Sequence, residues 1–124
     1  NESELHALTG ETGFDKAVIQ VKKMMGIHGS GDGRLCIIKL GAEGAALIDG
    51  DKLFRAGAYP VTPVDTVGAG DLFNIGFLHA MFQIGMDSRN ALEFASTFAS
   101  VFISKYYGNP PTQNEIMDLM KQLA

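Results

Sequence analysis

The chain has little cysteine and few basic residues. Its 124 residues include one cysteine, Cys36, so an internal disulfide cannot form. A lone cysteine is typical of reducing compartments, and we expect a cytoplasmic protein. The formal net charge is −4, and the lysines and arginines are scattered along the chain. Nucleic-acid and membrane surfaces attract basic clusters, so we expect neither nucleic acid nor a membrane as a partner.

Long apolar runs and a leader sequence are also missing. The longest stretch without a charged residue, 72–86, contains Asn74, His79 and Gln83 and is too polar for a transmembrane helix. The start is acidic and polar, unlike a signal peptide, and lacks an initiator methionine. We therefore expect the chain to begin within a longer protein. The three histidines lack the spacing of metal ligands.

The length and the apolar content of 46% suit one soluble domain over residues 1–124. Turn residues and apolar periodicity predict five helices, at 3–9, 14–25, 71–84, 88–107 and from 113 onward. Apolar runs predict strands at 34–40, 45–48 and 52–55, with a hairpin turn at 49–51. The first strand is apolar almost throughout, as in parallel sheets buried on both faces. We therefore expect an α/β fold with a few parallel strands and one hairpin.

Several residues make this prediction specific. Ser3 is a candidate N-cap and Gly10 a stop for the first helix, and Thr112 with Glu115 forms a capping box for the last. The helix at 71–84 lacks charge and is expected to be buried as a central helix. The helix at 14–25 carries an apolar stripe of Phe14, Ala17, Val18, Val21, Met24 and Met25. In the helix at 88–107, Ala91, Ala95 and Ala99 recur every four residues and permit a close approach of another helix.

The most informative stretch is 64–77, where a loop with two glycines leads into a helix. Gly68 and Gly70 allow positive φ and a close approach of the backbone to a ligand. Unpaired amides at a helix start, together with the helix dipole, bind anions such as phosphate. Asp71 would repel that anion unless its carboxylate takes part in the chemistry, for example by accepting a proton from a hydroxyl. Neither a Walker loop nor the dinucleotide-binding pattern fits this stretch.

Residues 65–73, DTVGAGDLF, resemble the signature D-T-x-G-A-G-D-x-F of the ribokinase-like, or pfkB, carbohydrate kinases. Two further matches follow the family's order. Asn1 and Glu4 resemble its N-x-x-E motif, and residues 39–44, KLGAEG, resemble its [K/T]-L-G-x-x-G turn. The resemblance implies the C-terminal part of a ribokinase-like, three-layer α/β/α, Rossmann-like fold.

The resemblance also implies roles for these residues. Asp71 would be the catalytic base, and the backbone amides of Gly68, Ala69 and Gly70 would form the anion hole for ATP. Lys39, Gly41 and Gly44 would lie near the nucleotide phosphates. Ser96 and Gly108 would lie near the adenine, although residues 106–109, YYGN, depart from the more common R-x-G-A ending and leave the base contacts open.

Metal roles rest on the same resemblance. Asn1 and Glu4 would help organise Mg²⁺ indirectly, whereas the residues alone indicate a helix cap and a surface acid. Asp65 and the carbonyl of Val67 would hold a monovalent cation such as K⁺. From the sequence alone, Asp65 is as well explained by closure of an Asx-turn.

The function expected from the resemblance is ATP-dependent phosphorylation of a hydroxymethyl group on a sugar-like small molecule. The missing N-terminal region would carry the sugar-binding residues, so we expect this chain alone to be inactive and to expose a sheet edge or an apolar face. The intact protein could form a homo-oligomer. The alternative is a non-catalytic nucleotide-binding or interaction domain that keeps the kinase fold. A dinucleotide-dependent oxidoreductase is disfavoured because Phe73 stands where its pattern needs glycine.

Overall fold

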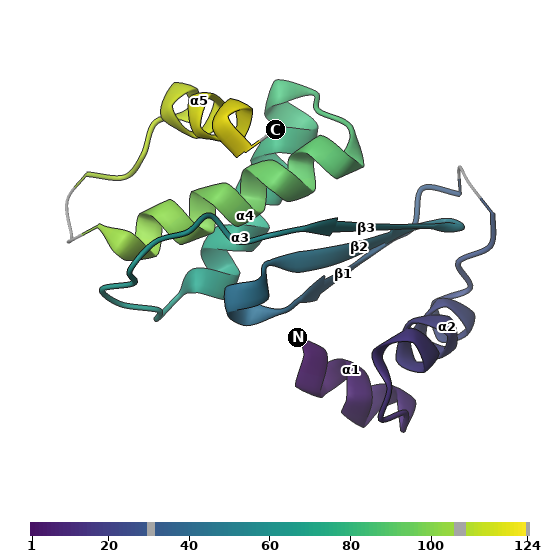
Figure 1. Cartoon of the computed structure of the whole chain (residues 1–124). Coiled ribbons are helices and arrows are strands. Elements are labelled where there is room, and N and C mark those ends of the chain that lie inside the picture. Colours follow the sequence, from purple (N-terminus) through teal and green to yellow (C-terminus); the bar gives the residue numbers. More distant parts are fainter. Residues whose placement is uncertain (30–31, 106–108, 124) are drawn as a thin grey trace. The chain divides into compact units, whose positions relative to one another are not determined.

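The computed structural model describes residues 1–29, 32–105 and 109–123. They belong to two compact units, Asn1–Arg55 and Ala56–Ala124. Figure 1 labels the elements of both units. Every helix in the described ranges falls short of the length and apolar character that a membrane crossing needs.

The first unit begins with α1 (Glu2–Thr9) and α2 (Phe14–Met25). Of the two candidate caps, Asn1 and not Ser3 is the N-cap of α1, and its side-chain oxygen accepts a 2.9 Å hydrogen bond from the amide of Glu4. Asn is as good a cap as Ser, and Asn1 has Glu4 at the capping-box distance. Gly10 ends α1 in the left-handed conformation, as expected, with φ of 71°.

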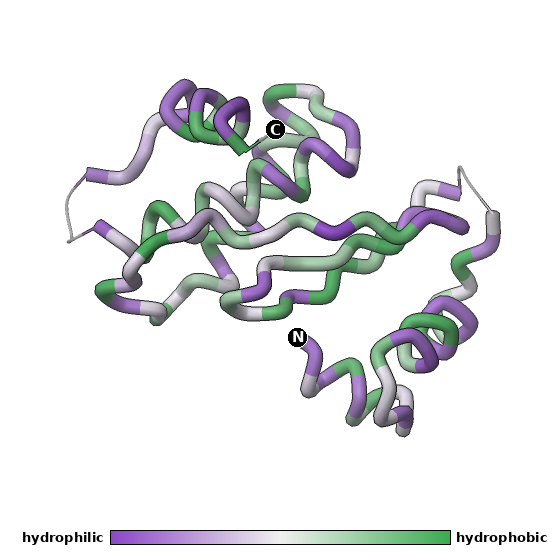
Figure 2. Tube along the Cα trace, in the orientation of Figure 1, coloured by the Kyte–Doolittle hydropathy of each residue, from purple (hydrophilic) through white to green (hydrophobic). Residues whose placement is uncertain are grey.

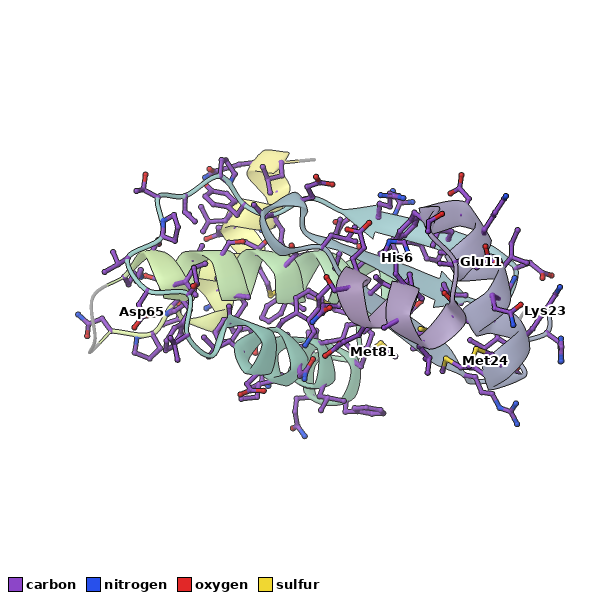
Figure 3. All side chains as sticks on the ribbon, turned by 90° about the horizontal axis from the view of Figure 1, so that it is seen from below. His6, Glu11, Lys23, Met24, Asp65 and Met81 are labelled. Carbon is purple, nitrogen blue, oxygen red and sulfur yellow. The ribbon has the colours of Figure 1, made fainter. Side chains whose placement is uncertain are left out.

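Both helices of the first unit pack on its sheet through one apolar cluster. The predicted stripe of α2 is confirmed in its first two turns, where Ala17, Val18 and Val21 are buried. Its end was predicted wrongly, because Met24 and Met25 are exposed (Figure 3 labels Met24). The buried members of the cluster are Leu5, Ala17, Val18, Val21, Ile27, Ile38, Ala46 and Ile48.

The sheet has three strands in the order β1 (Leu35–Lys39), β2 (Ala45–Asp49) and β3 (Lys52–Ala56). β1 and β2 pair antiparallel, with Leu35 opposite Asp49 and Lys39 opposite Ala45. Both strands are mainly hydrophobic in Figure 2. The expected parallel pairing is therefore wrong for this pair. The apolar run of β1 indicated burial, but the short connection through η1 (Gly41–Glu43) permits only an antiparallel return.

The predictions for the second strand and the hairpin agree better with the structure than the prediction of parallel pairing. Ala45, Ala46, Leu47 and Ile48 are all buried, so β2 is the strand covered on both faces. Gly50 has φ of 58° at the predicted hairpin turn into β3. The guanidinium of Arg55 on β3 lies 4.4 Å from the ring centroid of Phe14, which ties the end of the hairpin to α2.

The second unit consists of α3 (Ala69–His79), the π-helical turn η2 (Ala80–Ile84), α4 (Ser88–Ser104) and α5 (Gln113–Leu123). α4 packs against both α3 and α5. The small residues of α4 allow a close approach, as predicted. A Cβ added to Gly76 of α3 would lie only 3.3 Å from the Cα of Ala95.

Side-chain caps define α4 and α5. Asp87 begins α4 by accepting a 2.8 Å hydrogen bond from the amide of Asn90. The predicted capping box of α5 is confirmed. The amide of Thr112 donates to Oε2 of Glu115 at 2.7 Å, and the amide of Glu115 donates to Oγ1 of Thr112 at 3.3 Å. α4 ends at Ser104, before the predicted end at Tyr107, which lies outside the described residues.

The expectation of a fully buried helix at 71–84 is only half correct. Phe73, Phe77 and Ala80 are buried, whereas Ile75, Leu78 and Phe82 are exposed. The absence of charge indicated contact with other apolar groups, but only one side of the helix finds them within the described residues.

Candidate active site

Backbone hydrogen bonds hold the loop that leads into α3. The amides of Val64 and Asp65 donate to the carbonyl of Ile103 on α4, at 2.8 and 3.3 Å. Asp65, labelled in Figure 3, accepts a 2.9 Å bond at Oδ1 from the amide of Val67. This is the Asx-turn that the sequence left as one alternative. The amide of Ala69 then donates to the carbonyl of Thr66 at 3.2 Å and completes the entry to the helix.

Gly68 opens α3 without placing a side chain in front of it. It is the N-cap, with φ of 80° and ψ of 0°, and a Cβ built on it would meet nothing within 4 Å. An ordinary cap would use its side chain to cover the first-turn amides. Gly68 makes no side-chain cap hydrogen bond and places no side chain at the positive end of the helix dipole. Anion binding at this helix start stays a prediction.

Asp71 lies in the first turn of α3, two residues beyond Ala69, and its side chain is exposed. An acidic residue in this turn complements the helix dipole, which is the structural explanation for it. Its carboxylate also stands within the same turn as the candidate anion-binding amides. A hydroxyl held at that place would have a base for its proton beside groups that neutralise negative charge.

The glycine turn of the first unit has a defined shape. The amide of Leu40 donates to the carbonyl of Gly44 at 2.8 Å, and the amide of Gly44 donates to the carbonyl of Gly41 at 3.1 Å. Gly41 has φ of 61°, and Gly44 has φ of 93° with ψ of −125°, a conformation that in practice only glycine adopts. Lys39 ends β1 directly before this turn and is half-buried. A phosphate-binding role for these three residues stays a prediction.

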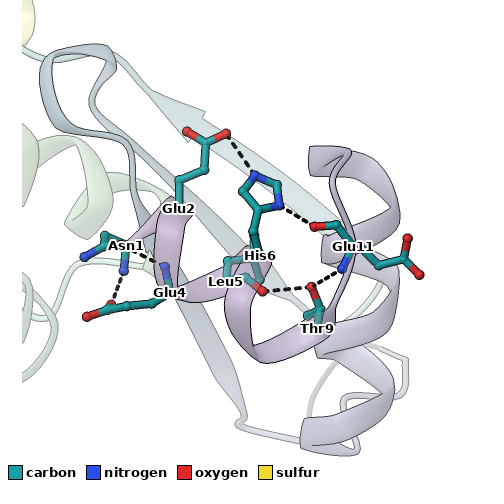
Figure 4. Close-up of polar contacts among 7 residues, drawn as sticks. All are labelled: Asn1, Glu2, Glu4, Leu5, His6, Thr9 and Glu11. Carbon is teal, nitrogen blue, oxygen red and sulfur yellow. Dashed lines mark hydrogen bonds and ion pairs between the residues drawn. The ribbon is translucent and has the colours of Figure 1, made fainter.

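Asn1 and Glu4 form a reciprocal capping box at the start of α1 (Figure 4). The backbone nitrogen of Asn1 donates to Oε2 of Glu4 at 2.5 Å. This hydrogen bond lowers the pKa of the Glu4 carboxyl, and the charge of Lys39 acts in the same direction. The first unit thus brings two predicted site residues, Glu4 and Lys39, within electrostatic range of each other. The cap explains Asn1 and Glu4 structurally, and their Mg²⁺ role stays a prediction.

Figure 4 also shows how α1 ends. Nδ1 of His6 lies 2.7 Å from the carbonyl oxygen of Glu11, and Nε2 lies 3.5 Å from Oε1 of Glu2. Oγ1 of Thr9 donates to the carbonyl of Leu5 at 2.8 Å. These contacts join α1 to the segment before α2 and give His6 a structural role. His79 has a similar one, with Nε2 3.0 Å from Oε1 of Gln113.

The two predicted adenine contacts have different outcomes. Ser96 is buried in α4, and its Oγ donates a 2.9 Å hydrogen bond to the carbonyl of Gly57. That bond gives Ser96 a structural role, and its nucleotide role stays a prediction. Gly108 lies outside the described residues.

Sequence reasoning missed the residue that anchors the loop. The carbonyl of Ile103 accepts hydrogen bonds from both loop amides, but any residue supplies a carbonyl, so no sequence signal could identify it.

Within the described ranges, histidine, cysteine, aspartate and glutamate side chains nowhere form a group of three suited to a metal ion. Mg²⁺ often keeps its waters and binds through one or two carboxylates and the substrate phosphates, so the residues present are compatible with such an ion. Burial raises the pKa of the Cys36 thiol, and a raised pKa makes a thiol less reactive.

The known proteins that resemble this chain are carbohydrate kinases. The family model described as pfkB family carbohydrate kinase matches residues 1–115. Ribokinase of Bacillus subtilis is 39% identical over 82 residues, which are 64% of this chain and 28% of that protein. The 1-phosphofructokinase of Haloferax volcanii is 38% identical over 100 residues, 81% of this chain and 32% of that protein. The chain thus spans less than a third of the length of these curated relatives.

A solved structure extends the likeness to nearly the whole chain. Ribokinase of Arabidopsis thaliana, in complex with ribose and ATP, superimposes with a TM-score of 0.78 and is 31% identical. The match covers 98% of this chain and 39% of that one.

Proposed function

Because the chain belongs to the pfkB family of carbohydrate kinases, we propose that it forms the nucleotide-binding and catalytic C-terminal part of an ATP-dependent sugar kinase. The observation that carries this proposal is the start of α3. There Gly68, at φ of 80°, places no capping side chain in front of the helix, and Asp71 presents an exposed carboxylate in the same turn. This arrangement supports an anion site and a base within residues 68–71.

In the proposed reaction, a hydroxymethyl oxygen of the acceptor attacks the γ-phosphorus of ATP. The new oxygen–phosphorus bond forms as the bond from the γ-phosphorus to the β,γ-bridging oxygen breaks, and ADP leaves. Asp71 accepts the hydroxyl proton. The backbone amides of Gly68, Ala69 and Gly70 stabilise charge on the transferring group, so positioning and electrostatics supply most of the rate. Mg²⁺, when bound, would neutralise the phosphate oxygens, with Asn1 and Glu4 helping to organise it and Lys39, Gly41 and Gly44 near the phosphates.

The acceptor is proposed only at the level of its chemical class. Relatives of similar identity are named as a ribokinase and a 1-phosphofructokinase, and the Arabidopsis structure holds ribose with ATP. These acceptors share an alcohol on a sugar or sugar phosphate. We therefore propose a carbohydrate alcohol as the acceptor. The proposed adenine contacts are Ser96 and Gly108.

A monovalent cation is a further part of the proposal. Asp65 closes its turn through Oδ1, which accepts from Val67. A carboxylate oxygen of Asp65 and the carbonyl oxygen of Val67 are the kind of ligands that a monovalent cation takes. A K⁺ ion held there would lie beside the anion site and add positive charge to it.

The test is Asp71→Asn in the intact protein, with Asp118→Asn as the matched control at another exposed acid. A positioned base contributes about 10²–10⁴-fold, so kcat should fall by that factor. ATP affinity should change little, since the amides remain. The control should keep both values. Turnover near that of the unchanged enzyme would remove Asp71 from catalysis. An intact parent that binds ATP without phosphoryl transfer to any sugar would favour the non-catalytic binding domain instead.

A further inference from the structure

The segment that leads from β3 toward α3 is hydrogen-bonded to α4 near both of its ends. It comprises residues 57–65, which form neither helix nor strand, and we call it the entry segment. At its start, the carbonyl of Gly57 accepts a 2.9 Å hydrogen bond from Oγ of Ser96. At its end, the amide of Val64 donates to the carbonyl of Ile103 at 2.8 Å. Figure 1 shows the entry segment passing α4 on its way to α3.

Both anchors lie on the same side of α4. Ser96 and Ile103 are seven residues apart, which is about two helical turns and roughly 10 Å along the helix axis. Between the anchors, Pro60 and Pro63 have a fixed φ and lack an amide hydrogen. A segment that is held at both ends and stiffened by two prolines has few conformations open to it. The two anchors together therefore determine where the entry segment ends.

The same helix supports α3, which carries the candidate base. A Cβ added to Gly76 of α3 would lie 3.3 Å from the Cα of Ala95, the residue before Ser96. α4 thus holds α3 through Ala95 and the entry segment through Ser96. The turn at residues 66–68, which joins the entry segment to α3, is fixed from both sides by one helix.

We propose that Ser96 is a positioning residue for phosphoryl transfer. By donating to the Gly57 carbonyl, its hydroxyl keeps the entry segment on α4 and so fixes the Asp65 turn and the place of Gly68 before the candidate anion-binding amides. The effect on turnover rests on the proposed function, whereas the anchoring does not. The adenine contact that the proposed function includes for Ser96 would act on nucleotide affinity. Anchoring of the entry segment acts on the geometry of the loop, so the two roles can be separated.

Ser100 provides a matched control on the same helix. It lies one turn beyond Ser96, and both side chains are buried, with 7% and 3% of their surface exposed. Oγ of Ser100 donates a 2.8 Å hydrogen bond to the carbonyl of Ser96, within α4 itself. Ser96→Ala and Ser100→Ala each remove one buried hydroxyl and one hydrogen bond to a carbonyl. They differ in the partner, which is the entry segment for Ser96 and the helix for Ser100.

The experiment measures kcat, the Kd for ATP and the hydrogen exchange of the Val64 amide in the intact protein and in both variants. Small displacements of groups that position a reaction are costly, so kcat should fall about tenfold to 10²-fold in Ser96→Ala. The Val64 amide should exchange about three- to tenfold faster in this variant, because the entry segment opens more readily from α4. The Kd for ATP should change less than kcat. Ser100→Ala should match the parent in kcat and in exchange.

Three results would overturn the proposal. A higher Kd for ATP in Ser96→Ala with unchanged kcat and exchange would leave Ser96 with the adenine contact alone. Equal losses of kcat in both variants would show a general weakening of α4. Unchanged exchange at Val64 in Ser96→Ala would show that Ser96 does not hold the entry segment. Exchange requires no turnover, so faster exchange in Ser96→Ala of a parent without kinase activity would refute the proposed function and leave the anchoring intact.

Discussion

The amide of Val67 donates a 2.9 Å hydrogen bond to Oδ1 of Asp65, directly before Gly68 at the start of α3. This bond closes the loop over residues 65–67 and gives Asp65 a role that needs no cation. Two substitutions separate that role from a charge-dependent one. Asparagine keeps a side-chain oxygen that can close the same turn, and alanine removes it.

Asp65→Asn should keep the stability of the protein and lose its response to K⁺. The intact enzyme should be activated by K⁺ more than by Na⁺, and the variant should respond to neither, because the charge that holds the ion is gone. Asp65→Ala should also lose about 0.5–1.5 kcal/mol of unfolding free energy with the turn bond. Initial rates across a K⁺ and a Na⁺ series, together with urea unfolding, provide both readouts. Activity that is flat in K⁺ before any substitution would leave Asp65 with the turn alone.

Gly76→Ala should destabilise the protein, against the usual helix preference. Alanine in a helix interior is favoured over glycine by about 1 kcal/mol. At this site the new methyl would lie 3.3 Å from the Cα of Ala95 and 3.0 Å from Cδ1 of Phe98. Because the Cα of Ala95 is a backbone atom, α3 and α4 must move apart to make room for the methyl group. Overpacking of this kind costs about 1–3 kcal/mol.

Denaturant unfolding of Gly76→Ala should therefore show a net loss of about 1 kcal/mol. Gly57→Ala is the matched control, since a Cβ there meets nothing within 4 Å and φ is not positive. It should stay within about 0.5 kcal/mol of the parent. A gain in stability at Gly76 would mean that Phe98 moves aside and the contact between α3 and α4 is looser than its distances indicate.

Local signals in the sequence carried most of the secondary structure. The capping box of Thr112 and Glu115, the stop at Gly10 and the hairpin at Gly50 depend on neighbouring residues alone, and all three were predictable. The choice of Asn1 over Ser3 was also local, but two caps of equal quality lie two residues apart, and only the position of Glu4 favours one of them.

The direction of strand pairing and the exposure of side chains could not be predicted from neighbouring residues alone. The apolar run of β1 indicated a covered strand but not the direction of its neighbour, which depends on the tight turn through Gly41 and Gly44. The exposure of Ile75 and Leu78 depends on which segments are there to cover them. At the candidate site, the glycines and Asp71 were recognisable as a motif. The carbonyl of Ile103, which holds the loop, carries no side-chain signature.

Acid should weaken the start of α5 through Glu115. The hydrogen bond from the amide of Thr112 lowers the pKa of the Glu115 carboxyl below its ordinary value of 4.5. A depressed pKa in the folded state means that the stabilisation is present above the unfolded pKa and is lost as pH falls through the folded pKa. The free energy of unfolding should therefore fall as the pH drops below about 4.5. At neutral pH Glu115 is ionised in both states, so the full stabilisation is present.

The measurement compares unfolding of the parent and Glu115→Gln between pH 3 and pH 7, a range that includes the ordinary carboxyl pKa of 4.5. Glutamine keeps an oxygen for the Thr112 amide and does not titrate, so the difference between the two proteins should shrink on acidification. Asp118→Asn, at an exposed acid one turn further along α5, should leave the acid slope of the parent unchanged. Parallel acid slopes in the parent and Glu115→Gln would show that the capping box contributes no pH dependence.

The sharpest pair of substitutions is Gly68→Ala with Gly85→Ala. Gly68 opens α3 at φ of 80°, Gly85 ends η2 at φ of 81°, and a Cβ at either position meets nothing within 4 Å. The backbone penalty for an L side chain in the left-handed region is therefore matched, and each variant should lose about 1 kcal/mol of unfolding free energy. Only Gly68 stands in front of the candidate anion-binding amides. Its new methyl would occupy the space that a phosphate needs, so in the intact protein only Gly68→Ala should raise the Kd for ATP, measured by titration calorimetry. Equal ATP affinities in two variants of equal stability would mean that the start of α3 does not bind the nucleotide phosphates. A higher Kd for ATP in Gly68→Ala alone would locate the phosphate at that helix start. Lost stability could not explain this result, because Gly85→Ala carries the same backbone strain and keeps its ATP affinity.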